Sequence, residues 1–245
     1  MEDTEEKTVV VLEVDTQKSS PDVPKGLRAF IAGSTGEVGK ALTHELARSP
    51  QFTKVTLITR RPIELPSDKI YTKFDQKIVD FDNLAANHAA DFKGYDIGFC
   101  SLGTSRAKSG VDGFVKVDHD YIMAVGQLAK QGGCKHFSLV SSAGANKNSK
   151  VLYYKVKGQV EEEMKQLGFP RLSIWRPKVL LVKRVESRPG EKFFRCCFGC
   201  CDCCRCLSTH VSVLVKAMAN NAFKPGTSGI EIMNNRIIYN EARSI

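Results

Sequence analysis

Long apolar stretches are missing from this sequence of 245 residues. Uninterrupted aliphatic runs such as residues 9–12 and 179–182 have four residues, whereas a membrane-spanning helix needs about 20. The acidic first six residues lack the basic start and apolar core of a secretory signal. We therefore expect a soluble, intracellular protein.

Neither the hydrophobic nor the charged residues are unusually abundant or rare in the chain as a whole. Hydrophobic residues make up 42% and charged residues 26% of the chain, which excludes collagen-like, coiled-coil and wholly disordered proteins. No internal repeat with a period of roughly 20–50 residues is visible. At roughly 150 residues per domain, the length allows one large domain or two small ones.

The net charge of +9 is unevenly placed. Residues 1–25 contain seven acidic and three basic side chains, so that residues 26–245 carry +13. A basic body suits an anionic ligand, such as a nucleotide phosphate, an acidic partner or an anionic membrane surface. The basic residues form no dense patch interleaved with aromatic residues, so we expect no direct binding of nucleic acid.

Short apolar runs alternate with amphipathic stretches after a flexible N-terminal arm, residues 1–26. Strands that are continuous apolar runs, separated by helices, indicate a parallel sheet covered on both faces. We therefore predict a Rossmann-like, doubly wound α/β domain over residues 27–182, followed by a small, irregular C-terminal substrate or partner region, residues 183–245. The expected strands are residues 27–32, 54–59, 77–80, 95–102, 136–141 and 172–181, and the expected helices are residues 36–48, 83–92, 113–130, 151–167 and 211–222.

A glycine-rich turn follows the first expected strand and opens a helix. Gly33 permits the tight turn, Gly36 lets the backbone approach a pyrophosphate, and Gly39 lets the helix pack closely on the sheet. The free amides of the helix N-terminus favour phosphate. The loop between these glycines includes Ser34, Thr35, Glu37 and Val38. The pattern predicts nucleotide binding, although the glycines alone also fit an ordinary turn.

The end of the second strand indicates which dinucleotide binds. A carboxylate there would bind the ribose hydroxyls of NAD, whereas arginine accepts a 2′-phosphate. Arg60 and Arg61 stand at this point, and a guanidinium matches phosphate with two parallel hydrogen bonds. We predict NADPH/NADP over NADH, the alternative being a solvated arginine pair. Two further candidates are Asp80, which would meet the adenine amine, and Gly103, which would let the cofactor lie against the fourth strand.

A tyrosine and a lysine share one face of the helix after the fifth strand. Tyr153 and Lys157 are four residues apart, and an ammonium near a phenol favours phenolate and lowers the pKa of tyrosine. A serine at the strand end, Ser142 in preference to Ser141, would bind a substrate carbonyl oxygen. We therefore predict Tyr153, Lys157 and Ser142 as catalytic residues.

This combination resembles the extended, atypical short-chain dehydrogenases/reductases. More narrowly, it is similar to the Tat-interactive oxidoreductases and their fungal organelle-associated relatives. The similarity covers about residues 27–192. The matching stretches are residues 33–37, 55–61, 98–104, 132–137, 153–158 and 186–191.

The resemblance implies a Rossmann fold that binds NADPH, with Tyr153 as the catalytic tyrosine. We expect the protein in the cytoplasm, with the nucleus or the surface of an organelle membrane as alternatives. One departure is Lys178, where the family usually has glycine after Arg176 and Pro177; this lysine would narrow the substrate pocket. The cofactor contacts that the resemblance implies are Thr35, Gly36, Glu37, Val38, Arg60, Arg61, Leu102, Gly103, Lys157, Leu180 and Arg188.

Seven of the nine cysteines lie between Cys196 and Cys206. Three interpretations stay open for this segment: S-acylation and peripheral membrane contact, a soft-metal site, or a loop of reduced thiols. Cys100 and Cys134 stand alone in apolar segments, and we expect them to be small core residues.

Two functions from different classes fit the sequence. The first is an NADPH-dependent oxidoreductase acting on a small-molecule carbonyl substrate. The second is a non-catalytic regulator that senses NADPH and binds a protein partner in transport, transcription or cell-death control, as the resemblance suggests. A weaker third is an adaptor tethered to membranes by its cysteines. Neither the substrate nor the oligomeric state follows from the sequence.

Overall fold

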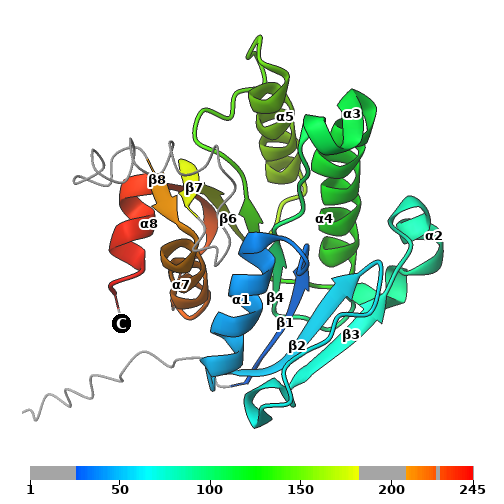
Figure 1. Ribbon diagram of the computed structural model, residues 1–245, viewed down its shortest axis with the longest axis vertical. Coiled ribbons are helices and arrows are strands. Elements are labelled where there is room, and N and C mark those ends of the chain that lie inside the picture. The colour runs from blue at the N-terminus through cyan, green and yellow to red at the C-terminus, as the bar shows by residue number, and fades with distance from the viewer. Residues whose placement is uncertain (1–25, 182–207, 225–226, 245) are drawn as a thin grey trace, which may run out of the picture.

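A parallel sheet of seven strands forms the centre of the computed structural model, which describes residues 26–181, 208–224 and 227–244 (Figure 1). The strand order is β3-β2-β1-β4-β5-β6-β9. Strands are added from β1 toward one edge of the sheet and from β4 toward the other edge, as in doubly wound sheets. This confirms the predicted Rossmann-like fold. The strands are β1 (Leu27–Ala32), β2 (Phe52–Thr59), β3 (Phe74–Ile78), β4 (Ile97–Cys100), β5 (His136–Val140), β6 (Arg171–Arg176) and β9 (Gly229–Asn234).

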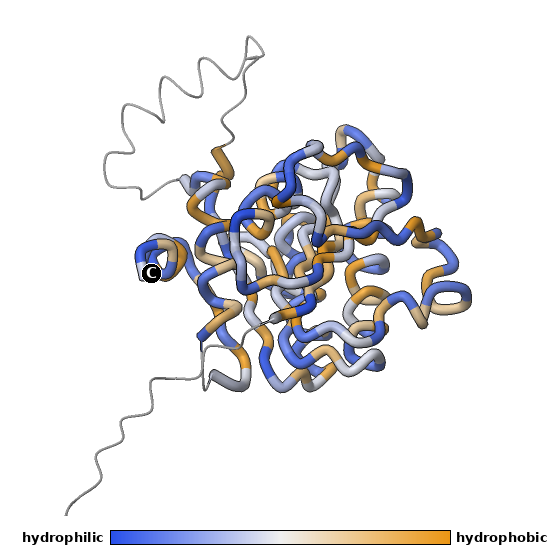
Figure 2. Tube along the Cα trace, turned by 90° about the horizontal axis from the view of Figure 1, so that it is seen from below, coloured by the Kyte–Doolittle hydropathy of each residue, from blue (hydrophilic) through white to orange (hydrophobic). Residues whose placement is uncertain are grey.

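Helices cover both faces of the sheet. Successive side chains of a strand point to opposite faces, and in this sheet both faces are apolar and need a cover. Ala29 and Ile31 pack with α1 and α7 in one apolar cluster, whereas Phe30 and Ala32 pack with α4 and α5 in the other. Apolar and polar segments alternate along the helical trace in Figure 2, as amphipathic helices require. The helices are α1 (Glu37–Arg48), α2 (Leu84–Asn87), α3 (Arg106–Val115), α4 (Tyr121–Gln131), α5 (Leu152–Gln166), α7 (Val211–Ala222) and α8 (Asn235–Glu241).

The third strand lies earlier than the sequence suggested. Residues 77–80 were expected, but β3 begins at Phe74 and pairs with residues 55–59 of β2. It is an edge strand, and its Asp75 forms an ion pair with Lys54 at 2.8 Å. Polar side chains on an edge strand hide the apolar pattern on which the prediction depended. The expected helix 83–92 is likewise wrong, since a short α2 lies between two 3₁₀ turns, Phe81–Asn83 and Ala89–Phe92.

The expected helix 113–130 begins earlier and is interrupted twice. Its first turn starts at Arg106, and Gly110 breaks it with a φ of 71°. A π-helical turn, Lys116–Asp120, then joins α3 to α4. Such π-helical insertions occur frequently at functional sites.

The expected strand 172–181 is two strands in different sheets. Pro177 follows β6, and proline has no N–H to donate to a strand ladder. The chain resumes as β7 (Val179–Leu181), which pairs with β8 (Ser208–His210) in a second, parallel sheet. The described C-terminal residues share the main core, because β9 pairs with β6 and α7 packs beside α1 (Figure 1). The division of the chain at residue 182 stays a prediction.

Both isolated cysteines belong to the core, as predicted. Cys100 and Cys134 are buried, and desolvation raises the pKa of Cys100 to about 11 and that of Cys134 to about 12. They therefore remain protonated thiols at neutral pH. No helix in the described part of the chain has both the length and the apolar character needed to cross a membrane.

Candidate functional site

The glycine turn after β1 is held tightly against its neighbours. Gly33 has a φ of 93°, and a Cβ there would lie 2.7 Å from the carbonyl carbon of Ser101. A Cβ on Gly39 would lie 2.1 Å from the carbonyl oxygen of Gly33. Gly36 is the N-cap of α1, and within the described ranges no side chain caps this helix end. The first amides of α1 are therefore available to an anion.

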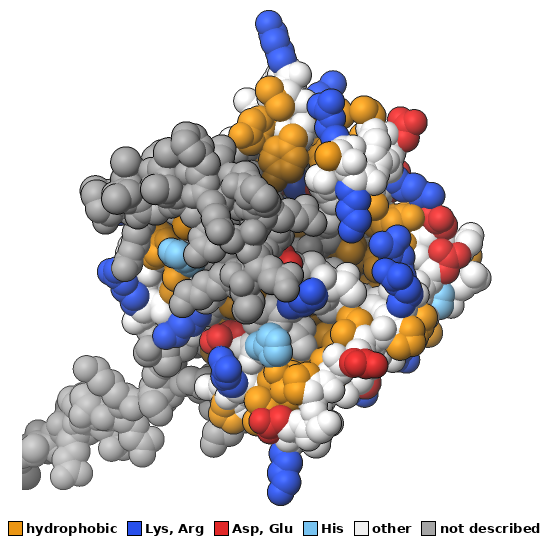
Figure 3. Space-filling model, viewed as in Figure 1, with side chains coloured by type: hydrophobic (Ala, Val, Ile, Leu, Met, Phe, Trp, Pro, Cys, Tyr) orange, Lys and Arg blue, Asp and Glu red, His pale blue; other side chains and the backbone are white. Residues whose placement is uncertain are grey.

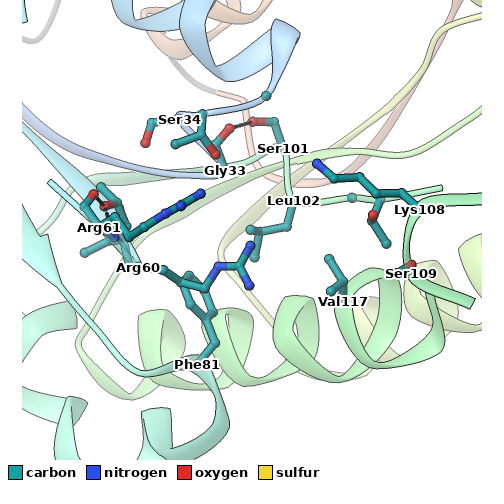
Figure 4. Close-up of a pocket in the computed structure, with 16 residues that line it drawn as sticks. Gly33, Ser34, Arg60, Arg61, Phe81, Ser101, Leu102, Lys108, Ser109 and Val117 are labelled. Atoms are coloured by element: carbon teal, nitrogen blue, oxygen red, sulfur yellow. Dashed lines mark hydrogen bonds between the residues drawn. The ribbon is translucent and has the colours of Figure 1, made fainter. Parts of the chain in front are cut away.

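A cavity of about 330 Å³ opens beside this turn (Figure 4). Arg60 and Arg61 extend into it from the end of β2, and Phe81 lies beneath Arg60. The cavity brings together eight of the predicted cofactor residues: Gly33, Ser34, Thr35, Gly36, Arg60, Arg61, Leu102 and Gly103.

The residues of this cavity fit a phosphorylated dinucleotide. The Ser34 hydroxyl oxygen is buried and has no hydrogen-bond partner among the described residues, and such an atom indicates a missing ligand or water. Both arginines are exposed, and neither guanidinium forms an ion pair within the described ranges. No acidic residue is among the described residues that line the cavity.

Lys108 and Ser109 also line this cavity, from α3, and neither was predicted from the sequence. In Figure 4 the Lys108 side chain reaches past Leu102 toward Ser101, opposite the two arginines. These residues lie in the single helical turn before the Gly110 break. The sequence signal for Lys108 was a basic residue soon after the fourth strand. It was not used because no helix was expected at residues 106–109.

Glu37, Val38 and Asp80 are among the predicted cofactor residues that do not line this cavity. Glu37 is exposed in the first turn of α1, and Val38 packs into the core. Asp80 caps a 3₁₀ turn, where it accepts hydrogen bonds from the Asp82 amide at 2.9 Å and the Asn83 amide group at 2.7 Å. These bonds lower the pKa of Asp80. The cofactor contacts predicted for these residues stay predictions.

A second cavity, of about 660 Å³, contains two of the three predicted catalytic residues, Ser142 and Tyr153, together with Leu180. Ser141 lines it as well, but its hydroxyl donates a hydrogen bond to buried Glu161. Arg176 forms an ion pair with the same carboxylate. Ser141 is thus engaged in the core, which favours Ser142 as the serine that meets a substrate.

Lys157 is not among the described residues that line either cavity. It is held by a buried partner, Asp118, that was not predicted from the sequence. The Lys157 Nζ lies 2.8 Å from Oδ1 of Asp118, and both residues are buried. Oδ2 of Asp118 accepts the Thr104 amide at 2.7 Å, and a Cβ on Gly103 would lie 3.3 Å from Oδ1. Asp118 lies in the π-helical turn. It therefore connects the predicted catalytic helix to the strand end that borders the first cavity.

Arg188 and the segment from Cys196 to Cys206 lie outside the described residues. The cofactor contact of Arg188 and the three interpretations of the cysteines therefore stay predictions.

Residues 33–175 match a family model described as NAD(P)H-binding. The chain belongs to this NAD(P)H-binding family. It is 46% identical to Protein HTATIP2 of Rattus norvegicus over 211 residues, which cover 85% of this chain and 86% of the relative. It is also 34% identical to Protein FMP52, mitochondrial, of Saccharomyces cerevisiae over 164 residues, covering 66% of this chain and 69% of that one.

Solved structures of low sequence identity share the fold of this NAD(P)H-binding family member. MoeE5 in complex with UDP-glucose and NAD matches with a TM-score of 0.62 at 16% identity, covering 84% of this chain and 75% of that one. A UDP-galactose 4-epimerase matches with a TM-score of 0.62 at 15% identity, covering 85% and 76%. These structures show the fold, and the family model supports a nicotinamide cofactor.

Proposed function

We propose that the protein binds NADPH and reduces a carbonyl substrate, with Tyr153 as the proton donor. The observation that carries the proposal is a pair of cavities, one lined by the glycine turn and the arginine pair, and the other lined by Ser142 and Tyr153. Arg60 and Arg61 would hold the 2′-phosphate, and the amides of α1 with Lys108 would hold the pyrophosphate.

NADPH, when bound, supplies the hydride that the carbonyl carbon accepts. Ser142 donates a hydrogen bond to the carbonyl oxygen and orients it. Tyr153 then transfers its phenolic proton to that oxygen, which yields the alcohol. Lys157 holds the cofactor ribose, and Asp118 holds the Lys157 ammonium in place.

One observation favours a second candidate function, an NADPH-binding regulator without turnover. The charge of Lys157 would stabilise a Tyr153 phenolate, but the Asp118 carboxylate at 2.8 Å offsets that charge. A site with this Lys157–Asp118 ion pair can bind a cofactor tightly while it promotes proton transfer by Tyr153 only weakly. The partner of such a regulator would be a protein.

Turnover of NADPH in the presence of a panel of aldehydes and ketones separates the two functions. We expect wild-type protein to oxidise NADPH, and Tyr153→Phe to lower kcat at least about 100-fold while changing the Kd for NADPH less than about threefold. Tyr95→Phe, which removes a phenol outside both cavities, is the matched control. Tight NADPH binding without turnover of any panel member would reject the reductase and favour the regulator.

A further inference from the structure

One edge of the main sheet is open among the described residues. β9 is the last strand in the sheet order, and within the described ranges it pairs with β6 alone. The Gly229 amide donates a hydrogen bond to the Pro170 carbonyl at 2.8 Å, on the β6 side. Backbone groups alternate in direction along a strand, so the N–H and C=O groups of Ile230 and Ile232 point away from β6. These groups face the open edge of the sheet.

The same two isoleucines extend the apolar face of the sheet beyond the part that α5 covers. Ile230 and Ile232 lie beside Leu172 and Ile174 of β6 in the strand register. Leu172 and Ile174 are 1% and 0% exposed, whereas Ile230 and Ile232 are 51% and 40% exposed. An open edge that also presents apolar side chains is a template for pairing with another strand.

The opposite edge strand, β3, is protected by charge. Asp75 and Lys77 of β3 both form ion pairs, at 2.8 and 2.9 Å, and charged side chains on an edge strand discourage further pairing. The charged residue of β9 is Glu231, and Arg171 binds its carboxylate at 2.9 Å. The open edge at β9 is therefore the better template for a further strand.

The N-terminal arm contains a segment suited to this edge. Residues 8–14 include four valines and one leucine, and β-branched residues favour extended strands. In an extended segment, Val10, Leu12 and Val14 share one face. This segment lies outside the described residues, which begin at Gly26.

The length of the arm allows it to reach β9. All strands of the main sheet are parallel, so β1 and β9 begin at the same end of the sheet. The strands β4, β5 and β6 lie between them, which is a distance of roughly 19 Å at the usual strand spacing. Residues 15–26 can span up to about 40 Å when extended. A strand antiparallel to β9 would end where this linker has to begin, and antiparallel edge strands are common on parallel sheets.

Charge favours contact between the arm and the folded body. Residues 1–25 contain seven acidic and three basic side chains, whereas residues 26–245 carry +13. Lys and Arg side chains are spread over the face of the molecule shown in Figure 3. The attraction therefore brings the arm near the body without selecting one site, and the open backbone and apolar face of β9 select the site.

We propose that residues 8–14 pair with β9 as an antiparallel strand of the main sheet, and that Val10 and Leu12 cover Ile232 and Ile230. The arm of the same chain is favoured over a second copy because its covalent connection gives it a high effective concentration at the edge. This inference does not depend on the proposed reductase function.

The register follows from the positions of the carboxylates. With Leu12 opposite Ile230, Glu13 lies opposite Gly229. A shift by two residues would place Glu13 opposite Glu231, and like charges that face each other destabilise a strand pair.

Amide hydrogen exchange, followed residue by residue by NMR, tests the proposal on the full chain. We expect the amides of residues 9–14 to exchange at least about tenfold more slowly than in a synthetic peptide of residues 1–20. Ile230→Glu combined with Ile232→Glu should bring these rates to the peptide values, because the apolar cover is lost and the acidic arm is repelled. Ile70→Glu combined with Ile78→Glu is the matched control, since these isoleucines are 38% and 48% exposed near the opposite edge of the sheet.

A reciprocal variant keeps the test decisive if the β9 substitutions disturb folding. Val10→Glu combined with Leu12→Glu should raise the exchange rates of the Ile230 and Ile232 amides about tenfold. Unchanged rates of these two amides would overturn the proposal, as would exchange of residues 9–14 at the peptide rate in wild-type protein. Slow exchange that requires high protein concentration, together with a dimeric mass in light scattering, would assign the edge to a second copy and would also overturn it.

Discussion

The Nζ of Lys157 lies 2.8 Å from Oδ1 of Asp118, and this buried ion pair connects α5 to the π-helical turn. The other carboxylate oxygen accepts the Thr104 amide, so one side chain fixes the lysine and the loop after β4. Removing one member of such a pair leaves an uncompensated buried charge. We infer that Asp118 acts as a positioning residue for both cavities.

Asp118→Asn should therefore destabilise the protein by about 3 kcal/mol. Urea unfolding measures this change directly, with Asp112→Asn as the control because Asp112 is exposed in α3. The variant should also weaken NADPH binding, since Lys157 loses its anchor. Unfolding free energies that agree within error for wild type and Asp118→Asn would show that the pair does not position these elements.

The glycine turn offers a pair of substitutions that separates folding from binding. Gly39→Ala should cost about 2 kcal/mol of stability, because its Cβ would lie 2.1 Å from the Gly33 oxygen. Gly36→Ala has an ordinary φ of −78° and a 3.4 Å contact, so stability should change by less than about 0.5 kcal/mol. Its methyl group stands at the helix end where phosphate would bind, and the Kd for NADPH should rise about tenfold. Unchanged NADPH affinity in Gly36→Ala would place the phosphates elsewhere.

Lys108 faces the cavity from the side opposite Arg60 and Arg61. If it contacts the pyrophosphate, Lys108→Met should raise the Kd for NADPH and the Kd for NADH by the same factor, about fivefold. Lys93→Met, an exposed lysine outside both cavities, should leave both values unchanged. A loss confined to NADPH would instead assign Lys108 to the 2′-phosphate.

His119 makes the stability depend on pH. Burial opposes its protonation, but hydrogen bonds to Asp120 at 2.8 Å and Glu163 at 3.1 Å raise the pKa of His119 above its usual value. A raised pKa in the folded state stabilises the protein fully below the unfolded value of about 6.5, and the contribution is lost as the pH rises through the folded value. Thermal unfolding across this range should show a fall in Tm that is smaller in His119→Gln. Identical pH profiles for the two proteins would rule out this contribution.

The sequence predicted the elements that bury a continuous apolar run. The strands β1, β2 and β5 and the helix α1 lie close to where they were expected, because their burial pattern is local and strong. The edge strand β3 was misplaced, since its polar residues such as Asp75 and Lys77 pair with neighbours in space. Tertiary pairing cannot be recognised in a local pattern.

The sequence predicted those site residues whose position relative to a strand end indicates their role. The glycine turn and the two arginines converge as expected because the carboxyl ends of parallel strands meet at one edge of a sheet. Asp118 and Lys108 were missed because a lone acid and a lone lysine look like surface residues in a sequence. Only the π-helical turn and the Gly110 break place them at the site.

Calorimetric titration of NADPH and NADH into the same protein tests the central claim, that the glycine turn and the arginine pair bind a 2′-phosphorylated dinucleotide. We expect NADPH to bind at least about tenfold more tightly than NADH. Replacement of both Arg60 and Arg61 by Met should bring the two Kd values within about threefold of each other by weakening NADPH alone. Equal affinity of wild-type protein for the two coenzymes, or no heat with either, would contradict the account.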